Sequence, residues 1–238
     1  MKKSFSLIIV IAVLLSGCIP TQRAVFNPGS QPQIKSIGIL RIYNPISYDS
    51  VDLAGPEGAA GLLPPGLAAG IIKGKDRKEQ FQTMMVSSSF DFSKVLTERL
   101  KTELQNSGYS VVDIPATREN SKTLVKDYSN LNSTVDAYLD IAATFVGYNC
   151  NDKIFSRKYK PRIIVHANLI RSNTKEPIYS ELINYGDKSS SNCIHFPISE
   201  EYQYEKFEDL LNAKAEFIKG MNEGISKIAK QIAKDLSS

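Results

Sequence analysis

Three segments in the second half of the chain alternate apolar and polar residues with a period of two. They span residues 136–148, 161–172 and 178–186. Successive side chains of a β-strand point to opposite faces, so this pattern predicts strands of a sheet with one covered face. A polar turn sequence joins the last two, which predicts an antiparallel meander. In the first strand the covered face is expected to carry Ala137, Leu139, Ile141, Ala143 and Phe145.

Helical periodicity flanks this meander on both sides. Phe92, Leu96, Leu100 and Leu104 recur every four residues, and Gly108 follows where a helix C-cap is expected. Residues 34–43 and 109–114 are rich in β-formers, and residues 205–236 are expected to be helical, with a break near the two glycines. A short helix is also predicted over residues 118–128. The fold class is therefore α/β (an α+β sandwich), a mixed sheet with an antiparallel C-terminal meander and helices covering one face.

The amino terminus has the features of an export signal. Two lysines precede a nine-residue apolar run, Leu7–Leu15, which is too short to span a bilayer but suits a secretory signal. The run ends in "LSGC", which resembles the bacterial lipobox, where the chain is cut before the cysteine and Cys18 is acylated. Several acyl chains hold a protein stably on a membrane. The resemblance implies an outer-membrane location facing the periplasm, since Ile19 is not the aspartate that retains enterobacterial lipoproteins in the inner membrane.

Length and charge suit one exported domain. We expect residues 1–17 to be the signal peptide, residues 18–33 the lipidated cysteine and a proline-containing tether, and residues 34–238 a single domain. The domain and tether carry 27 Lys and Arg against 25 Asp and Glu, a net charge near +2. That balance excludes a nucleic-acid binder of the usual basic kind.

Residues 55–75 form a Gly- and Pro-rich apolar insertion without a charge between Glu57 and Lys73. Its paired prolines forbid a continuous helix there. It is expected to be a loop lying on the domain. The alternatives are a hairpin that touches a membrane or another subunit, and an ordered element that packs on the domain. The partner-binding hypothesis rests on the apolar side chains Leu62, Leu63, Ile71 and Ile72.

The two remaining cysteines, Cys150 and Cys193, are predicted to form a disulfide. Disulfides form in exported proteins, and both cysteines are expected just beyond strands that end at the same edge of the meander. The alternative is a metal site that adds His195 and His166, although the spacing matches no metal-ligand pattern. We therefore expect no metal.

No catalytic motif stands out. The chain lacks a nucleophile elbow, a P-loop, a dinucleotide fingerprint and a zinc-protease motif. A Ser–His–Asp arrangement stays open because serine and aspartate are plentiful, yet the sequence nominates no catalytic residue. We expect a protein that is not an enzyme, with no cofactor and no small-molecule substrate.

The order of parts, with "VLTERLKTELQNSGYSVVD" followed by "DAYLDIAATFVGY", resembles bacterial envelope lipoproteins with a fold like the TolB amino-terminal domain. Relatives of that kind include curli-secretion lipoproteins and outer-membrane activators of penicillin-binding proteins. The resemblance implies an accessory or assembly factor that binds another envelope protein. Its alternatives are a self-assembling secretion pore of curli type and an activator of a cell-wall synthase. For the last of these, a tether of residues 19–33 is short, since it reaches roughly 50 Å when extended.

Overall fold

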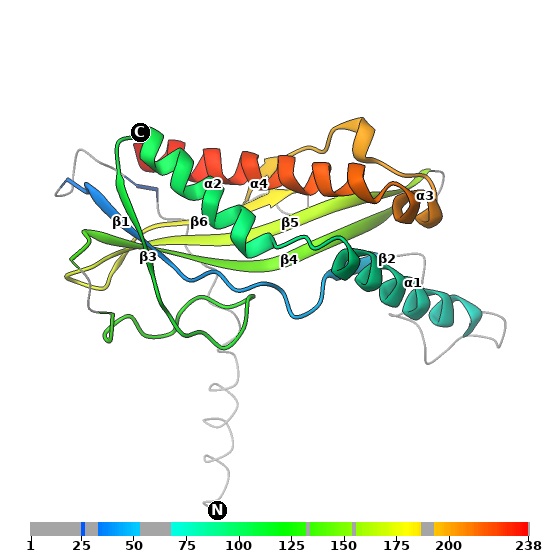
Figure 1. Ribbon diagram of the computed structural model, residues 1–238, viewed down its shortest axis with the longest axis horizontal. Helices are drawn as coiled ribbons and strands as arrows, with labels where there is room; N and C mark the ends of the chain where they lie inside the picture. The colour runs from blue at the N-terminus through cyan, green and yellow to red at the C-terminus, as the bar shows by residue number, and fades with distance from the viewer. Residues whose placement is uncertain are drawn as a thin grey trace, which may run out of the picture.

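The computed structural model describes residues 25–26, 33–52, 68–131, 134–153, 156–186 and 193–237 (Figure 1). The first half of the chain contains β1 (Ser36–Leu40), β2 (Asp49–Asp52), α1 (Ala68–Ser87), α2 (Phe92–Asn106) and β3 (Ser110–Ile114). The second half contains β4 (Ala137–Lys153), β5 (Ser156–Arg171), β6 (Pro177–Tyr185), β7 (Ile194–Phe196), a 3₁₀ turn η4 (Glu200–Tyr202), α3 (Phe207–Asn212) and α4 (Lys214–Ser237).

The seven strands of the described residues belong to one mixed sheet in the order β3-β1-β4-β5-β6-β7, with β2 also pairing with β4. The β4-β5-β6 part is antiparallel, which confirms the predicted meander and the predicted fold class. β1 is parallel to both β3 and β4, and β2 continues along the same side of β4. β1 therefore lies between two parallel neighbours, one before it and one after it in the sheet order.

A bulge in β4 changes which side chains face the helices. The register with β5 shifts between Ala143 and Phe145. Beyond it Val146, Tyr148 and Cys150 join the main core, whereas the sequence pattern placed Phe145 there. The assignment of Phe145 to the covered face is therefore wrong, because one extra residue in a strand moves every later side chain to the opposite face.

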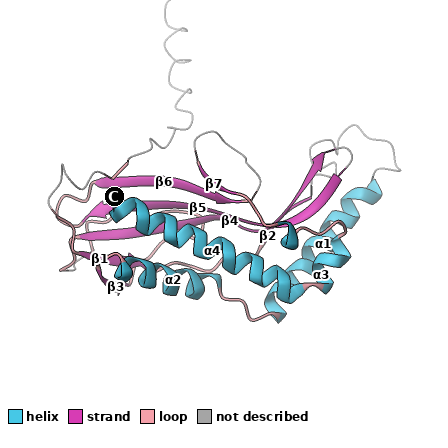
Figure 2. Ribbon diagram, turned by 90° about the horizontal axis from the view of Figure 1, so that it is seen from above, coloured by secondary structure: helices cyan, strands magenta, loops and turns pink. Residues whose placement is uncertain are grey.

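Helices α2 and α4 lie side by side on one face of the sheet (Figures 1 and 2). The predicted stripe of α2 is fully buried, and Asp91 caps its first turn. Gly108 has a φ of 91°, the conformation expected after the helix end. α4 buries a longer stripe, and its break from α3 falls at Ala213 rather than at the glycines. Its buried side chains include Phe217, Met221, Ile225, Ile228, Ile232 and Leu236.

The apolar insertion is partly helical, because α1 begins at Ala68 and includes the end of the 55–75 segment. The expectation of a loop up to residue 75 is wrong for that part. Beyond Pro65 the segment has no further proline, and Ala68 and Ala69 favour helix. Farther along, Phe81 is fully buried and meets the rings of Tyr148 and Phe217 edge-on.

The segment of residues 115–131 crosses the opposite face of the sheet near β1 (Figure 1). It has turns but no helix, so the short helix predicted over residues 118–128 is wrong. A second, smaller core lies beneath it, formed by Leu40, Ala116, Val125, Val135, Tyr138 and Ile170. None of the helices in the described part of the chain is long and apolar enough to cross a membrane.

Candidate functional site

The residues predicted to make contacts outside the domain lie mostly beyond the described ranges. Cys18, Leu62 and Leu63 fall outside them. For Ile71 and Ile72 the structure describes only the backbone, which belongs to α1. The anchor and this contact surface therefore stay predictions.

The sheet register does not bring the two later cysteines together. Cys150 lies inside β4, paired with Tyr159 of β5, rather than beyond the strand end, and it is buried. Cys193 precedes β7, so two whole strands separate it from β4. Three strand spacings amount to about 14 Å, while disulfide Cα atoms lie about 4.4–6.8 Å apart. The structure thus does not support the predicted disulfide.

The alternative metal site is not assembled either. Within the described residues no three His, Cys, Asp or Glu side chains gather in a way that could hold a metal ion. His195 Nε2 lies 2.7 Å from the carbonyl of Gly186, and His166 Nε2 lies 3.1 Å from Ser180 Oγ. The two histidines lie on different strands, β5 and β7, and each has its own hydrogen-bond partner.

Within the part of the chain that the structure describes, the Ser180–His166 pair has no available carboxylate as the third member of a catalytic triad. Asp140 is the acid whose charge acts on His166. Its two carboxylate oxygens are already held by Arg118, by the backbone N–H of Val125 and by Tyr128, as described below. Burial lowers the pKa of His166, and Asp140 raises it to a smaller extent. Ser180 itself is only 6% exposed, so this arrangement fits a structural hydrogen bond inside the sheet.

A groove lies at the carboxyl ends of β1 and β3. In open sheets of this kind ligands bind outside the carboxyl ends of parallel strands, where the chain passes from one side of a central strand to the other. β1 has this position: after β2, α1 and α2 the chain enters β3 on one side of β1 and then β4 on the other. We call this hollow the strand-end groove, and it has two lobes that share Arg41 and Pro115.

The first lobe is a cavity of about 520 Å³ between the two strand ends and the first half of α2. That volume lies in the usual range of binding pockets. Isoleucines from β1, from the loop after β1 and from β3 contribute apolar surface. α2 contributes hydroxyl and charged side chains. The lining includes Ile39, Ile42, Ile114, Ser93 and Thr97.

The charged side chains of the first lobe give it an excess of positive charge. Lys101 and Asp113 form an ion pair with each other. Glu98 is the other acid in the lining, whereas Arg41 and Lys94 are both cations. Neither cation has a carboxylate of the described residues within ion-pair distance, although Arg41 lies 5.5 Å from the ring centre of Tyr43.

The amino terminus of α2 borders this lobe, but its amides are already occupied. Asp91 Oδ1 accepts a hydrogen bond from the backbone N–H of Lys94 at 2.9 Å, and Asn44 Oδ1 accepts one from Ser93 at 2.8 Å. The hydrogen bond from Lys94 is the main reason that the pKa of Asp91 lies below its usual range. The helix end therefore offers no vacant anion site, and the attraction for an acid comes from the two side chains.

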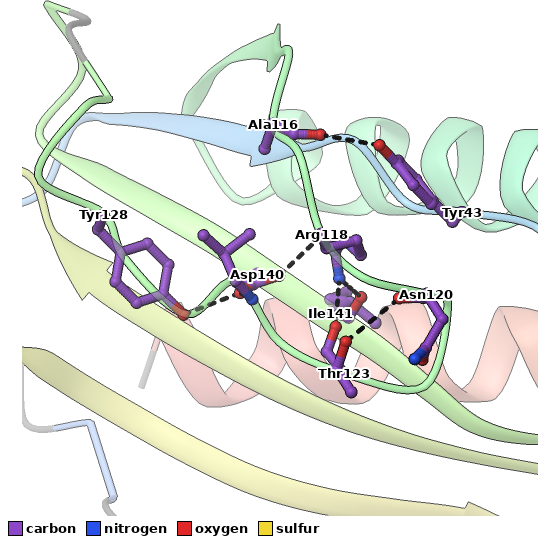
Figure 3. Close-up of polar contacts among 9 residues, drawn as sticks. Tyr43, Ala116, Arg118, Asn120, Thr123, Tyr128, Asp140 and Ile141 are labelled. Atoms are coloured by element: carbon purple, nitrogen blue, oxygen red, sulfur yellow. Dashed lines mark hydrogen bonds and ion pairs between the residues drawn. The ribbon is translucent and has the colours of Figure 1, made fainter.

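The second lobe, about 440 Å³, lies between Tyr43 and the segment of residues 115–131. Its shape depends on a buried ion pair beneath that segment (Figure 3). Arg118 Nη2 lies 2.8 Å from Asp140 Oδ1, and both side chains are 0% exposed. Arg118 also donates to the carbonyl of Ile141 at 2.7 Å, and its guanidinium lies 5.8 Å from the ring centre of Tyr43.

The other oxygen of Asp140 holds the far end of the same segment. Oδ2 accepts hydrogen bonds from the backbone N–H of Val125 at 2.7 Å and from the hydroxyl of Tyr128 at 2.8 Å (Figure 3). Burial, the Asp140 charge and this hydrogen bond raise the pKa of Tyr128, so its hydroxyl remains a donor. One carboxylate thus fixes three points along the segment that forms the wall of the second lobe.

No motif in the sequence points to this groove directly. The signal that could have found it is the strand–helix–strand order of residues 34–114, since it predicts a crevice at the carboxyl ends of the strands. Pro115, directly after β3, marks the point where that strand stops.

Comparisons with known proteins leave the family open. No family model matches the chain, and no curated protein matches it. The solved structures that are similar include two that match over about nine tenths of both chains. One is protein XCC0632 from Xanthomonas campestris, described by the family model DUF330, with a TM-score of 0.39 and 11% identity. The other is a neuraminyllactose-binding hemagglutinin homolog from Helicobacter pylori, with a TM-score of 0.32 and 13% identity. Likeness at this level says nothing about what this chain binds.

Proposed function

We propose that the chain is a lipid-anchored accessory or assembly factor that binds another envelope protein and performs no catalysis. The observation that carries the proposal is the strand-end groove. Apolar side chains line it, cations without an ion pair border it, and the exposed edge strand β3 contributes its last residues to it. A surface of this kind suits a segment of another protein.

The anchor is proposed to be Cys18, on the outer membrane and with the domain in the periplasm. It is supported by the charge, apolar run, small residues and cysteine at the start of the chain. A Cys18→Ser variant should appear in the soluble fraction of broken cells, whereas the unchanged chain should fractionate with the outer membrane. Mass spectrometry of the amino-terminal peptide should show acyl groups only in the latter. An unmodified Cys18 on the membrane-bound chain would contradict the anchor.

Partner binding is tested by placing a photo-crosslinking residue in the groove. Thr97 on α2 lines the first lobe and is partly exposed. Glu208 is exposed on α3, at the other end of the molecule, and is the matched control position (Figure 1). In intact cells we expect one defined adduct with a different envelope protein from position 97 and not from position 208. Equal adducts from both positions, or none from position 97, would overturn the proposal.

The same experiment separates the two alternatives. Ladders of the chain with itself would favour the self-assembling pore, and an adduct with a cell-wall synthase would identify the activator.

The apolar insertion is a second proposed contact. Replacing Leu62, Leu63, Ile71 and Ile72 with serine should weaken partner binding and leave the fold intact, while unchanged binding would place the contact elsewhere.

A further inference from the structure

β3 is an edge strand with one open side. Among the described residues it is the first strand in the sheet order and pairs with β1 alone. Three of its five residues are exposed, and Val112 is 43% exposed although it is apolar. An edge of this kind presents unpaired backbone groups to any chain that lies alongside.

The hydrogen bonds to β1 show which backbone groups are open. The N–H of Ser110 donates to the carbonyl of Lys35 at 2.8 Å, and the N–H of Arg41 donates to the carbonyl of Ile114 at 3.0 Å. In a parallel ladder every second residue bonds to the same neighbour. Ser110, Val112 and Ile114 therefore pair with β1, and the N–H and C=O groups of Val111 and Asp113 point to the open side.

The open edge ends at the basic part of the groove. Asp113 and Ile114 line the first lobe together with Arg41 and Lys94. Asp113 is already paired with Lys101, so Arg41, Lys94 and Glu98 are the charged side chains of the lobe outside that ion pair, and positive charge is in excess. A chain that continues from the edge into the groove would meet apolar surface and two positive side chains.

We infer that β3 binds the partner as an added strand: an extended segment of the partner pairs with the backbone of Val111 and Asp113. An acidic side chain of that segment lies against Arg41 and Lys94. This rests on the proposed function and names the kind of ligand. A second copy of the chain fits less well as the added strand. The one acidic residue of its β3 is Asp113, which already forms an ion pair with Lys101.

The backbone contact can be tested by a pair of substitutions at Val111. Val111→Pro removes an N–H that the sheet itself does not use, and proline is tolerated on an edge strand when its missing N–H faces outward. Val111→Ala removes the same side chain but keeps the N–H, so it is the matched control. Hydrogen exchange on the lipidated chain tests the premise that the N–H groups of Val111 and Asp113 face the open side. Their amides should exchange faster than those of Ser110 and Val112.

Capture is measured in intact cells with a photo-crosslinking residue at Val112, which projects from β3, and in parallel at Thr97 in the groove. We expect Val111→Pro to reduce the amount of adduct about tenfold, which corresponds to a loss of about 1.4 kcal/mol of binding free energy. Val111→Ala should leave the amount of adduct nearly unchanged. Arg41→Glu with Lys94→Glu should reduce it as well. Peptide sequencing of the adduct should find an extended segment with a carboxylate beside apolar residues.

The outcomes separate the two levels of the proposal. A partner captured equally by the proline and alanine variants would overturn strand addition and leave the proposed function standing. An adduct at twice the mass of the chain would assign the edge to a second copy, and an adduct with a small amphiphile would assign the groove to that ligand. No protein adduct from either position would overturn both. Thermal unfolding of the two variants at similar temperatures shows that the proline has not unfolded the sheet.

Discussion

Replacing Arg118 with methionine should strongly destabilise the domain. The side chains of Arg118 and Asp140 are both 0% exposed, and their ion pair of 2.8 Å is their main electrostatic compensation. Removing one partner leaves a buried charge without its counterion, which costs about 3–5 kcal/mol. For a domain of this size that loss should lower the melting temperature by about 6–20 °C. Equilibrium unfolding in urea, on the Cys18→Ser chain, measures the change.

A neighbouring exposed ion pair provides the control. Lys126 and Glu119 belong to the same segment, with side chains 74% and 59% exposed. Lys126→Met should therefore cost less than about 1 kcal/mol. The double variant Arg118→Met with Asp140→Asn should lose less unfolding free energy than the sum of the two single variants, because it leaves no uncompensated charge. An Arg118→Met cost equal to that of Lys126→Met, or strictly additive costs, would refute the reasoning.

Three further changes test other parts of the structure. Gly224→Ala should cost about 1–3 kcal/mol in urea unfolding, because its Cβ would lie 2.4 Å from the Tyr185 ring; a neutral effect would show that α4 can move away from the sheet. Asp136→Ala should cost about 1.5–3 kcal/mol at pH 7, since Asp136 Oδ2 accepts bonds from both N–H and Oγ–H of Ser36, and a stability equal to that of the unchanged chain would contradict it. Burial lowers the pKa of His166 from 6.5, so below that pH the unfolded chain binds more protons and stability falls as pH falls. His166→Gln should flatten the slope of melting temperature between pH 7.5 and 5.5, and an unchanged slope would assign the pH dependence to other groups.

The parts of the fold that could be predicted from the sequence are those set by local periodicity. The β4-β5-β6 meander and the buried stripe of α2 follow from periods of two and nearly four residues, and the structure confirms both. The helix predicted over residues 118–128 fails for a tertiary reason. There Arg118 and the Val125 amide bind Asp140, fifteen or more residues away in the sequence, and these bonds replace helical ones.

The structure does not support the predicted disulfide between Cys150 and Cys193, because the positions of the two cysteines depend on strand lengths that periodicity does not define. β4 continues to Lys153, so Cys150 lies within it, and the bulge after Ala143 turns that side chain into the core. β7 then adds a further strand beyond the meander, next to Cys193. Neither the bulge nor a three-residue strand leaves a period in the sequence long enough to recognise.

For the groove, too, only part could be predicted from the sequence. Its position follows from the order of strand, helix and strand, but its charge depends on which cations find a partner. The sequence does not reveal that Lys101 forms an ion pair with Asp113 while Lys94, seven residues earlier on α2, forms none with a carboxylate of the described residues. That distinction depends on which side chains the packing of α2 against β3 brings together.

Both walls of the groove are fixed before any ligand arrives. On one side Asp91 and Asn44 hold the first turn of α2, and on the other Asp140 holds the segment of residues 115–131 at three points. A preformed surface loses little conformational freedom on binding, so most of the ordering falls on the incoming segment. The chain therefore suits a partner whose binding segment is extended or disordered until it is captured, and whose sequence supplies the carboxylate that Arg41 and Lys94 lack.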